Sequence, residues 1–332
     1  MSDSPTLSIV VPMFNEQDNV RPMVERVHAA LAGQGYDWEL ILVDDGSTDE
    51  TRARMLAERE RHGAHLRLVQ LARNFGQTAA MQAGIDHAQG DVIAFLDGDL
   101  QNDPADIPAM VQRLIDEDLD LVAGWRRSRQ DALWQRKIPS MIANRLIRKV
   151  TGVVLHDYGC SLKVFRAEVI KEVRLYGEMH RFIPAWIATR TTPARIAEQV
   201  VNHYPRAHGT SKYGISRTFR VIIDLLSVYF FLRYRARPGH FFGSIGLFFG
   251  ALGGLALLYL FFIKLFLGAS IGDRPLLIAG VMCVLVSVQM LTTGVLSELL
   301  ARTWFESGKA QSYVVRRDKD ERTAFRQEPS AS

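Results

Sequence analysis

The sequence predicts an α/β domain built on a mostly parallel, doubly wound sheet, followed by two helices long enough to cross a membrane. Two observations predict this fold class. In the N-terminal part of the chain, short apolar runs rich in β-branched residues alternate with segments whose apolar residues recur every three or four positions. That alternation is typical of strands and helices that follow one another in a sheet with helices on both faces. From about residue 239 onward, long stretches carry almost no charge.

The individual elements can be placed in order along the chain. Strands are predicted where apolar runs stop at polar turns, over 7–11, 38–43, 66–71, 92–96 and 119–122. Helices are predicted where apolar residues keep a helical spacing, over 20–31, 49–61, 77–87 and 105–115. Because strand and helix alternate, each crossover returns the chain to the same edge of the sheet, which favours parallel strands.

Two C-terminal segments are predicted to span a membrane. Phe241–Leu267 is apolar apart from Ser244 and Lys264, and Leu276–Ser297 has no charged residue. About 20 apolar residues suffice to cross the hydrocarbon core. A buried helical hairpin in a soluble protein is the weaker interpretation, because a helix that is apolar on every side needs a large protein around it.

Charge around these segments predicts their orientation. Arginines at 233, 235 and 237 precede the first segment, and basic residues at 302, 309, 316 and 317 follow the second, whereas the loop between them has one Asp and one Arg. By the positive-inside rule both termini and the globular domain of this multi-pass membrane protein are predicted to lie in the cytoplasm. The expected organisation is a globular domain over 1–210, amphipathic juxtamembrane helices over 211–238, a transmembrane hairpin over 239–300 and a polar tail over 301–332. The first half of the amphipathic segment could equally pack on the globular domain.

Composition excludes several classes of protein. The net charge of +4 is modest and its basic residues gather near the membrane segments, which favours contact with lipid headgroups and gives no support to nucleic-acid binding. The two cysteines, Cys160 and Cys283, lie in different parts of the chain and indicate neither a disulfide nor a zinc site. Neither the glycine motif of dinucleotide-binding folds nor that of P-loop nucleotidases occurs.

Polar clusters follow four of the predicted strands, at 12–16, 44–49, 73–77 and 97–101. In a parallel sheet these strand ends lie along one edge, where such folds bind ligands. Asp97, Asp99 and Gln101 follow the strand over 92–96 and offer only oxygen ligands, which suits Mg²⁺ or Mn²⁺ and, through the cation, a diphosphate. An Asp-x-Asp triplet alone arises readily by chance, so the neighbouring clusters carry the prediction.

Four motifs in order resemble glycosyltransferase family 2, which has the GT-A fold. They are Val10-Val11-Pro12-Met13-Phe14-Asn15-Glu16, Val43-Asp44-Asp45-Gly46-Ser47-Thr48-Asp49, Arg73-Asn74-Phe75-Gly76 and Asp97-Gly98-Asp99-Leu100-Gln101. Within that family the chain is similar to the polyprenyl-phosphate glycosyltransferases, which include dolichyl-phosphate mannose synthases and bactoprenol glucosyl transferases. The resemblance covers roughly residues 5–235.

The resemblance implies a role for each matching residue. The donor nucleotide would be bound by Pro12, Phe14, Glu16, Val43, Asp44, Asp45 and Asp97. The metal and diphosphate would be held by Asp97, Asp99 and Gln101, with Asp99 counted among the catalytic residues. Asp44 would also brace its turn, and one of the two aspartates at 44 and 45 could do only that, as the cap of the following helix.

Downstream residues would complete the site. The resemblance implies that Arg126, Arg136 and Ser140 bind the acceptor phosphate, for which the planar fork of arginine is suited. The alternative is that the basic residues over 126–137 form a membrane-facing patch. Arg206 and Lys212 would lie in a loop over the donor and neutralise the leaving diphosphate as catalytic residues. The segment Asp157–Lys163 also resembles part of the family and would lie near the acceptor, but neither it nor His208 is assigned a chemical role.

The predicted function is a metal-dependent, inverting glycosyltransferase that moves a hexose from a nucleotide-sugar to undecaprenyl (polyprenyl) phosphate in the lipid bilayer. The product would supply sugar for modification of a cell-envelope glycan such as lipopolysaccharide. UDP-glucose is the preferred donor and GDP-mannose the alternative. A processive polysaccharide synthase of the same fold would carry Q-x-x-R-W and more spans, which this chain lacks. A non-catalytic, membrane-tethered nucleotide-sugar sensor or scaffold is the candidate from another class. Relatives suggest a homo-oligomer.

Overall fold

The computed structural model describes residues 6–127, 147–148, 151–205, 229–231, 233–234 and 237–306. The chain divides into two compact units, Met1–Tyr229 and Phe230–Ser332. Most of the predicted juxtamembrane segment over 211–238 and of the tail over 301–332 lies outside the described residues, so these boundaries stay predictions.

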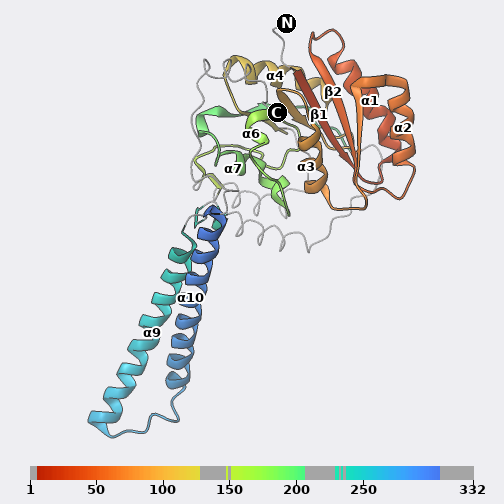
Figure 1. Cartoon of the computed structure of the whole chain (residues 1–332). Helices are drawn as coiled ribbons and strands as arrows, with labels where there is room; N and C mark the ends of the chain where they lie inside the picture. Colours follow the sequence, from red (N-terminus) through yellow and green to blue (C-terminus); the bar gives the residue numbers. More distant parts are fainter. Residues whose placement is uncertain are drawn as a thin grey trace. The chain divides into compact units, whose positions relative to one another are not determined.

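A seven-stranded sheet forms the centre of the first unit, with the strand order β3-β2-β1-β4-β6-β5-β7 (Figure 1). The strands are β1 Thr6–Met13, β2 Asp37–Asp44, β3 Leu66–Gln70, β4 Val92–Phe95, β5 Leu121–Trp125, β6 Lys163–Arg166 and β7 Ile196–Val200. β1 pairs in parallel with β2 and β4, β2 with β3, and β5 with β7, whereas β6 runs antiparallel to both of its neighbours. The predicted mostly parallel α/β sheet is therefore confirmed, and its first five strands lie where the sequence predicted them.

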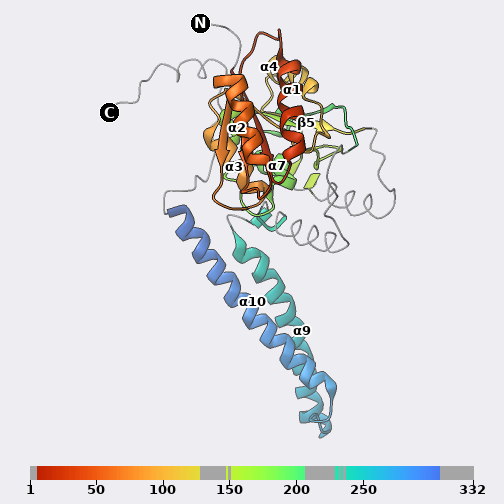
Figure 2. The ribbon, with the colours of Figure 1, turned by 90° about the vertical axis from the view of Figure 1, so that its right-hand side faces the viewer.

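Helices cover both faces of this sheet (Figures 1 and 2). On one face α1 (Val20–Leu31), α2 (Thr51–His62) and α4 (Ile107–Asp116) share a core with alternate residues of β1, namely Ile9, Val11 and Met13. On the other face α3 (Gln77–His87), α6 (Ala167–Ile170) and α7 (Ile183–Ile187) pack with the intervening Val10. Strands buried on both faces read as continuous apolar runs, which explains the sequence pattern of β1, β2 and β4. Short 3₁₀ turns lie at Gln17–Asn19, Gly63–His65, Pro104–Asp106, Met179–Phe182 and Pro193–Arg195.

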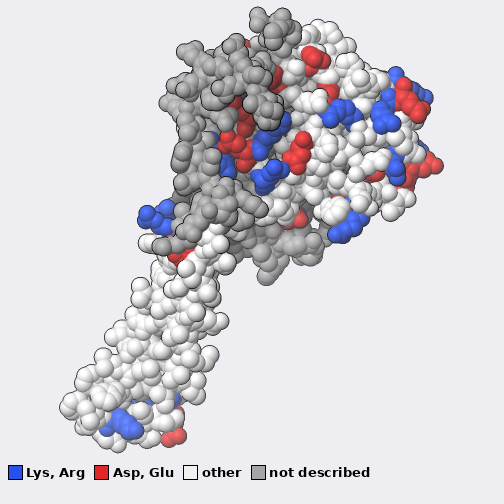
Figure 3. Space-filling view, in the orientation of Figure 1, with Lys and Arg blue, Asp and Glu red and all other residues white. Residues whose placement is uncertain are grey.

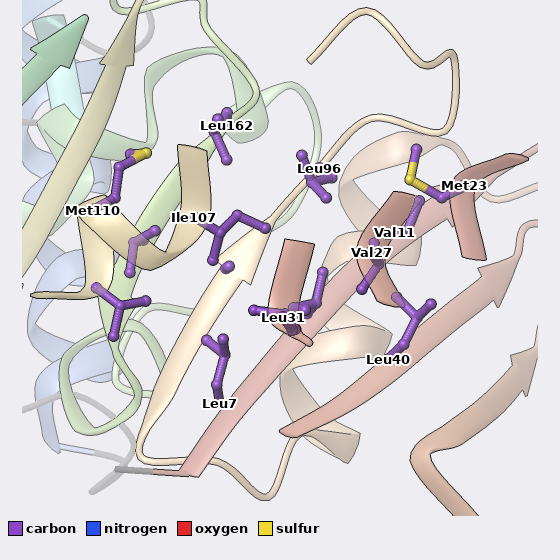
Figure 4. Packing of buried hydrophobic residues seen from close by; sticks show 14 of the residues in the cluster. Leu7, Val11, Met23, Val27, Leu31, Leu40, Leu96, Ile107, Met110 and Leu162 are labelled. Atoms are coloured by element: carbon purple, nitrogen blue, oxygen red, sulfur yellow. The ribbon is translucent and has the colours of Figure 1, made fainter. Parts of the chain in front are cut away.

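The first core is a continuous layer of aliphatic side chains. Figure 4 shows Met23, Val27 and Leu31 of α1 lying against Leu7 and Val11 of β1, with side chains of α4 beside them. All five are at most 3% exposed. The helical spacing of the α1 residues predicted this face, because positions three and four apart fall on one side of a helix.

Ion pairs join three strands at the end of the sheet where β5 and β7 begin, opposite the polar turns. Arg195, just before β7, pairs with Asp120 (Nε to Oδ2, 2.7 Å) and with Asp118 (Nη1 to Oδ2, 2.7 Å). Arg166, at the end of β6, pairs with Asp118 as well (Nη2 to Oδ1, 3.0 Å). The side chain of Asp120 is only 4% exposed, so its pair is shielded from water. This network joins β5, β6 and β7 and has a structural role.

The second unit is a hairpin of two long helices, α9 (Pro238–Leu267) and α10 (Pro275–Glu306), which run side by side in Figures 1 and 2. Their mean hydropathy reaches 2.2 in α9 and 2.1 over Pro275–Ala301, so both are long and apolar enough to cross a membrane. Figure 3 shows almost no charged side chain along them. At the start of α9 the backbone N–H of Gly239 donates to Glu298 Oε2 of α10 (3.3 Å), which ties the open end of the hairpin.

Small residues allow the two helices to approach closely. A Cβ atom at Gly253 of α9 would lie 2.7 Å from the carbonyl oxygen of Gly280 and 2.9 Å from Cys283 Cβ, both on α10. At Gly254, one position further on, a Cβ would meet no atom within 4 Å. Close contact through small residues is the usual way in which helices pack in lipid.

We therefore predict that Gly253→Leu separates α9 from α10, whereas Gly254→Leu does not. Overpacking of this kind costs about 1–3 kcal/mol. The measurement is the fraction of protein that stays monodisperse in detergent after heating, which Gly253→Leu should lower and Gly254→Leu should leave unchanged. Equal behaviour of the two variants would show that close packing at Gly253 does not hold the hairpin together.

Candidate active site

The carboxyl ends of β1, β2 and β4 meet at one edge of the sheet, and the predicted site residues follow them there. Pro12 and Val43 are partners in the register of β1 and β2, and Asp44 is the last residue of β2. After β4, the backbone N–H of Leu96 still donates to the carbonyl oxygen of Val10 on β1 (3.1 Å). This hydrogen bonding between the two strands therefore ends one residue before Asp97. The first, second and fourth polar turns therefore lie at one end of the sheet, as this parallel register requires.

Two of these turns are joined by hydrogen bonds. Asn15 Oδ1 accepts from the backbone N–H of Thr48 (2.8 Å), and the N–H of Asn15 donates to Ser47 Oγ (3.0 Å). The N–H of Glu16 donates to Thr51 Oγ1 (2.9 Å). Phe14 and Glu16, both predicted for the nucleotide pocket, are partly buried in this joined pair of turns.

Both aspartates after β2 are buried, at 3% exposure each, and both bind backbone. Asp44 Oδ1 accepts from the N–H of Ser47 (2.9 Å) within its own turn. Asp45 accepts from the N–H groups of Phe75 (2.8 Å) and Gly76 (2.9 Å), which belong to the turn after β3. The sequence left open that one aspartate only caps the following helix, but the N-cap of α2 is Glu50 and neither aspartate caps that helix. Asp44 braces its own turn, and Asp45 joins it to the turn after β3. Nucleotide binding by either remains a prediction.

Val43, also predicted for the nucleotide pocket, is fully buried at 0% exposure. It packs in the core with side chains of α3, such as Ala80. Its side chain therefore belongs to the core and does not line an open surface, and nucleotide binding by Val43 stays a prediction.

Asp97 and Asp99 form the acidic centre of the edge. Gln77, the first residue of α3, donates its amide N–H to Asp97 Oδ1 (2.8 Å). Burial first, and then the negative charge of Asp99, raise the pKa of Asp97 to about 6, although part of its surface remains accessible. Asp99, 6% exposed, accepts the backbone N–H of Gln101 (3.2 Å). The two negative charges repel each other, and a cation bound between the carboxylates would relieve this repulsion.

The donor set fits a hard divalent cation that keeps open positions. Within the described residues no cluster of three or more carboxylate, histidine or cysteine groups forms a metal site. Two carboxylates are nonetheless the usual protein share of a Mg²⁺ site whose remaining ligands are water and substrate phosphate. The amide nitrogen of Gln101 donates to the carbonyl of Tyr204 (3.4 Å), which leaves its amide oxygen as the atom for a cation. The set Asp97, Asp99 and Gln101 therefore fits the predicted Mg²⁺ or Mn²⁺.

Arg126, predicted for the acceptor phosphate, follows β5 and is held by a carboxylate of the protein. Its Nε and Nη2 donate to Asp157 Oδ2 (2.7 Å) and Oδ1 (3.0 Å). Burial would raise the pKa of Asp157, but the guanidinium outweighs it and holds that pKa below its ordinary value. This bidentate pair uses two of the donors on Arg126 and fixes the plane of the guanidinium. Arg136, Ser140, Arg206, His208 and Lys212 lie outside the described residues.

Sequence reasoning missed three contributors to the site. Gln77 and Asp157 bind predicted residues directly, and Lys163 opens β6, a strand that was not predicted. Only Lys163 leaves a signal in the sequence, since a lysine within the apolar run from Leu162 to Phe165 is unusual. The other two contacts depend on the tertiary pairing of distant segments.

A doubly wound sheet with one inserted antiparallel strand, and a carboxylate pair just past its fourth strand, define a glycosyltransferase of the GT-A type. The chain belongs to glycosyl transferase family 2, which residues 8–174 match. The resemblance found in the four motifs is thereby confirmed, and the protein is an enzyme of that family.

Curated relatives match almost the whole chain. Dodecaprenyl-phosphate galacturonate synthase of Rhizobium johnstonii is 60% identical over 317 residues, covering 96% of this chain and 94% of the relative. Undecaprenyl-phosphate 4-deoxy-4-formamido-L-arabinose transferases of Klebsiella pneumoniae and Pseudomonas aeruginosa are 36% and 33% identical, each covering 94% of this chain and 93% and 89% of the relative. The chain thus groups with the polyprenyl-phosphate transferases within its family. Neither sugar is glucose, so the predicted preference for UDP-glucose is not confirmed.

Solved structures share the fold of the first unit. Glucosyl-3-phosphoglycerate synthase of Mycobacterium tuberculosis bound to phosphoglyceric acid has a TM-score of 0.52 at 24% identity, covering 68% of this chain and 80% of that one. The same enzyme with Mn²⁺, UDP and glucosyl-3-phosphoglycerate also has a TM-score of 0.52, at 21% identity, covering 69% of this chain and 80% of that one. At these identities the likeness concerns the fold alone.

Proposed function

We propose that this enzyme transfers galacturonate from UDP-galacturonate to a polyprenyl phosphate, giving a lipid-linked uronic acid for a cell-envelope glycan. The observation that carries the proposal is the 60% identity, over 96% of the chain, to a dodecaprenyl-phosphate galacturonate synthase. The fold and the acidic edge of the sheet agree with a donor that carries a diphosphate.

The donor would bind at the joined turns after β1 and β2, with its diphosphate toward Asp97 and Asp99. Solved structures of the same fold contain UDP together with Mn²⁺, which supports a divalent cation at this position. When bound, the cation would neutralise part of the negative charge on the diphosphate as it leaves. Asp97, Asp99 and Gln101 would hold it, and Gln77 would keep Asp97 oriented through its 2.8 Å hydrogen bond.

The acceptor supplies its own nucleophile, because a phosphate monoester is an anion at neutral pH. One of its oxygens attacks the anomeric carbon from the face opposite the leaving group. The new bond joins that carbon to the acceptor phosphate, the bond to the β-phosphate of UDP breaks, and UDP leaves with the electron pair, so the configuration inverts. Catalysis then rests on positioning and charge neutralisation, and no aspartate need act as a strong base. Arg126 would orient the acceptor phosphate through the N–H groups that do not bind Asp157. Arg136, Ser140, Arg206 and Lys212 remain candidates for binding the acceptor phosphate or the leaving diphosphate.

The two apolar helices support a reaction at a membrane. A polyprenyl phosphate keeps its chain in the bilayer and its phosphate at the surface, so an enzyme anchored by α9 and α10 meets its acceptor there. The arginines before α9 and the basic residues after α10 support a cytoplasmic globular unit in the inner membrane.

Two donors that differ only at one carboxylate test the proposal. Purified full-length enzyme with Mn²⁺ and polyprenyl phosphate should move radiolabelled galacturonate from UDP-galacturonate into the lipid fraction. UDP-galactose should serve about 100-fold less well, because the group that pairs with the sugar carboxylate would be left without a partner. Equal use of both donors, or a preference for UDP-glucose, would contradict a uronate enzyme. UDP binding without transfer to any lipid would favour a nucleotide-sugar sensor instead.

A further inference from the structure

The segment Asp157–Lys163 resembles its family, yet the sequence assigns it no chemical role, and the fold places it between the two halves of the site. β6 begins at Lys163 and runs antiparallel between β4 and β5. In the sheet register Lys163 is the partner of Phe95 on β4 and of Ala123 on β5. It therefore lies between the strand that leads into Asp97 and the strand that leads into Arg126.

The side chain of Lys163 is buried at this position. The residue is 2% exposed, and its ammonium donates to the carbonyl oxygen of Cys160. Among the residues that the structure describes, no carboxylate forms an ion pair with this ammonium. A buried charge is costly unless neighbouring charges of opposite sign compensate for it. The carboxylates that act on it are those of Asp97 and Asp157.

The charges around Lys163 act on one another through space. Burial lowers the pKa of Lys163, while Cys160 and the carboxylates of Asp157 and Asp97 act in the opposite direction. The hydroxyl of Ser161, and after it the positive charges of Lys163 and Arg126, favour ionised Asp97, against burial and the charge of Asp99. The four groups form a cluster of alternating sign in which each charge limits where its neighbours can lie.

We propose that Lys163 is a positioning residue that holds Asp97 and the Arg126–Asp157 pair in one arrangement, and so aligns the donor diphosphate with the acceptor phosphate. An apolar residue would fill the same space without the desolvation cost, so packing alone does not explain a lysine here. The proposal rests on the function proposed above for the two substrates.

The test compares Lys163→Met and Lys163→Arg with a matched control, Lys171→Met. Lys171 also donates to a backbone carbonyl, that of Ala88 (2.7 Å), but at the amino edge of the sheet. In full-length enzyme, Lys163→Met should lower kcat and weaken UDP binding in the presence of Mn²⁺, each by about 10–100-fold, as loss of an outer-shell partner does. Lys163→Arg should restore most of both, and Lys171→Met should change neither.

The outcomes separate the possible roles of Lys163. Three results would support the proposal. Lys163→Met should lose transfer activity with both UDP-galacturonate and UDP-galactose, and Lys163→Arg should restore it. Lys163→Met should also melt at a temperature close to that of Lys171→Met. A loss confined to UDP-galacturonate would overturn the proposal, since Lys163 would then recognise the sugar carboxylate. Equal loss in the methionine and arginine variants, with lower melting temperatures, would assign it to packing, and wild-type behaviour of Lys163→Met would also overturn it. If the wild type transfers neither sugar, the proposed function fails, and calorimetric UDP–Mn²⁺ binding still tests Lys163.

Discussion

Replacing Asp99 with Asn should reduce sugar transfer by about 10²–10³-fold, the scale on which loss of one preorganised charge-stabilising group acts. Asp99 is 6% exposed and lies beside Asp97, where its charge helps to raise the pKa of that neighbour to about 6. An amide keeps the shape of the side chain but removes one of the two negative charges that would hold a divalent cation. The measurement is the rate of radiolabel transfer to polyprenyl phosphate, together with Mn²⁺ affinity in the presence of UDP.

Asp91→Asn is the control, because Asp91 precedes the same strand, β4, at its other end. Its carboxylate accepts from Thr6 Oγ1 (3.0 Å) at the surface, away from the polar turns. Transfer by Asp91→Asn should stay near the wild-type rate, and Asp99→Asn should melt at a similar temperature because its backbone turn can persist. Retention of transfer and of Mn²⁺ affinity in Asp99→Asn would remove Asp99 from the cation site.

The parallel half of the fold was predictable because its signals are local. β1, β2 and β4 are buried on both faces, so each is a continuous apolar run ended by polar turn residues. The helices α1 and α4 carry apolar stripes at helical spacing, and these stripes do face the first core. Turns at the ends of parallel strands must share an edge, so the neighbourhood of Asp45 and Asp97 followed from topology alone.

The inserted strand could not be predicted in the same way. β6 has four residues, begins with a charged lysine, and owes its direction to partners that are distant in sequence. β7 is an edge strand of partly exposed residues, including Glu198 and Gln199, so it lacks the apolar alternation of a buried strand. β6 and β7 both form because they pair with segments distant in the sequence, and strand propensity depends strongly on such tertiary context.

The residues of the site divide in the same way. The carboxylate pair at 97 and 99 indicates its chemistry by residue type and position after a strand, so a cation site could be predicted there from the sequence alone. The groups around this pair and around Arg126 could not, because Gln77, Asp157 and Lys163 acquire their roles only when separate segments meet. Arg126 shows the consequence, since its predicted phosphate-binding fork is shared with Asp157.

Gly46→Ala should cost about 3 kcal/mol of stability, from left-handed backbone strain of about 1 kcal/mol and overpacking of about 2 kcal/mol. Gly46 has φ = +70°. A Cβ there would lie 2.3 Å from the carbonyl carbon of Arg73 and 2.5 Å from the N of Asn74. Those are backbone atoms, so the whole turn after β3 would have to move. The melting temperature of the full-length enzyme should fall by about 6–12 °C.

Gly63→Ala is the control variant, because it introduces backbone strain without a steric clash. Gly63 has φ = +67° and ψ = −141°, a conformation that glycine adopts far more readily than other residues, and a Cβ there would meet no atom within 4 Å, so backbone strain of about 1–3 kcal/mol is expected without a clash. The two variants should differ further in UDP binding, because displacing the turn at residue 73 pulls Phe75 and Gly76 away from Asp45 and opens the joined turns where the nucleotide would bind. Gly46→Ala should therefore lose UDP affinity while Gly63→Ala keeps it. Identical melting and UDP binding in both would mean that the turn after β3 yields freely, and the Asp45 contacts would then not shape the donor site.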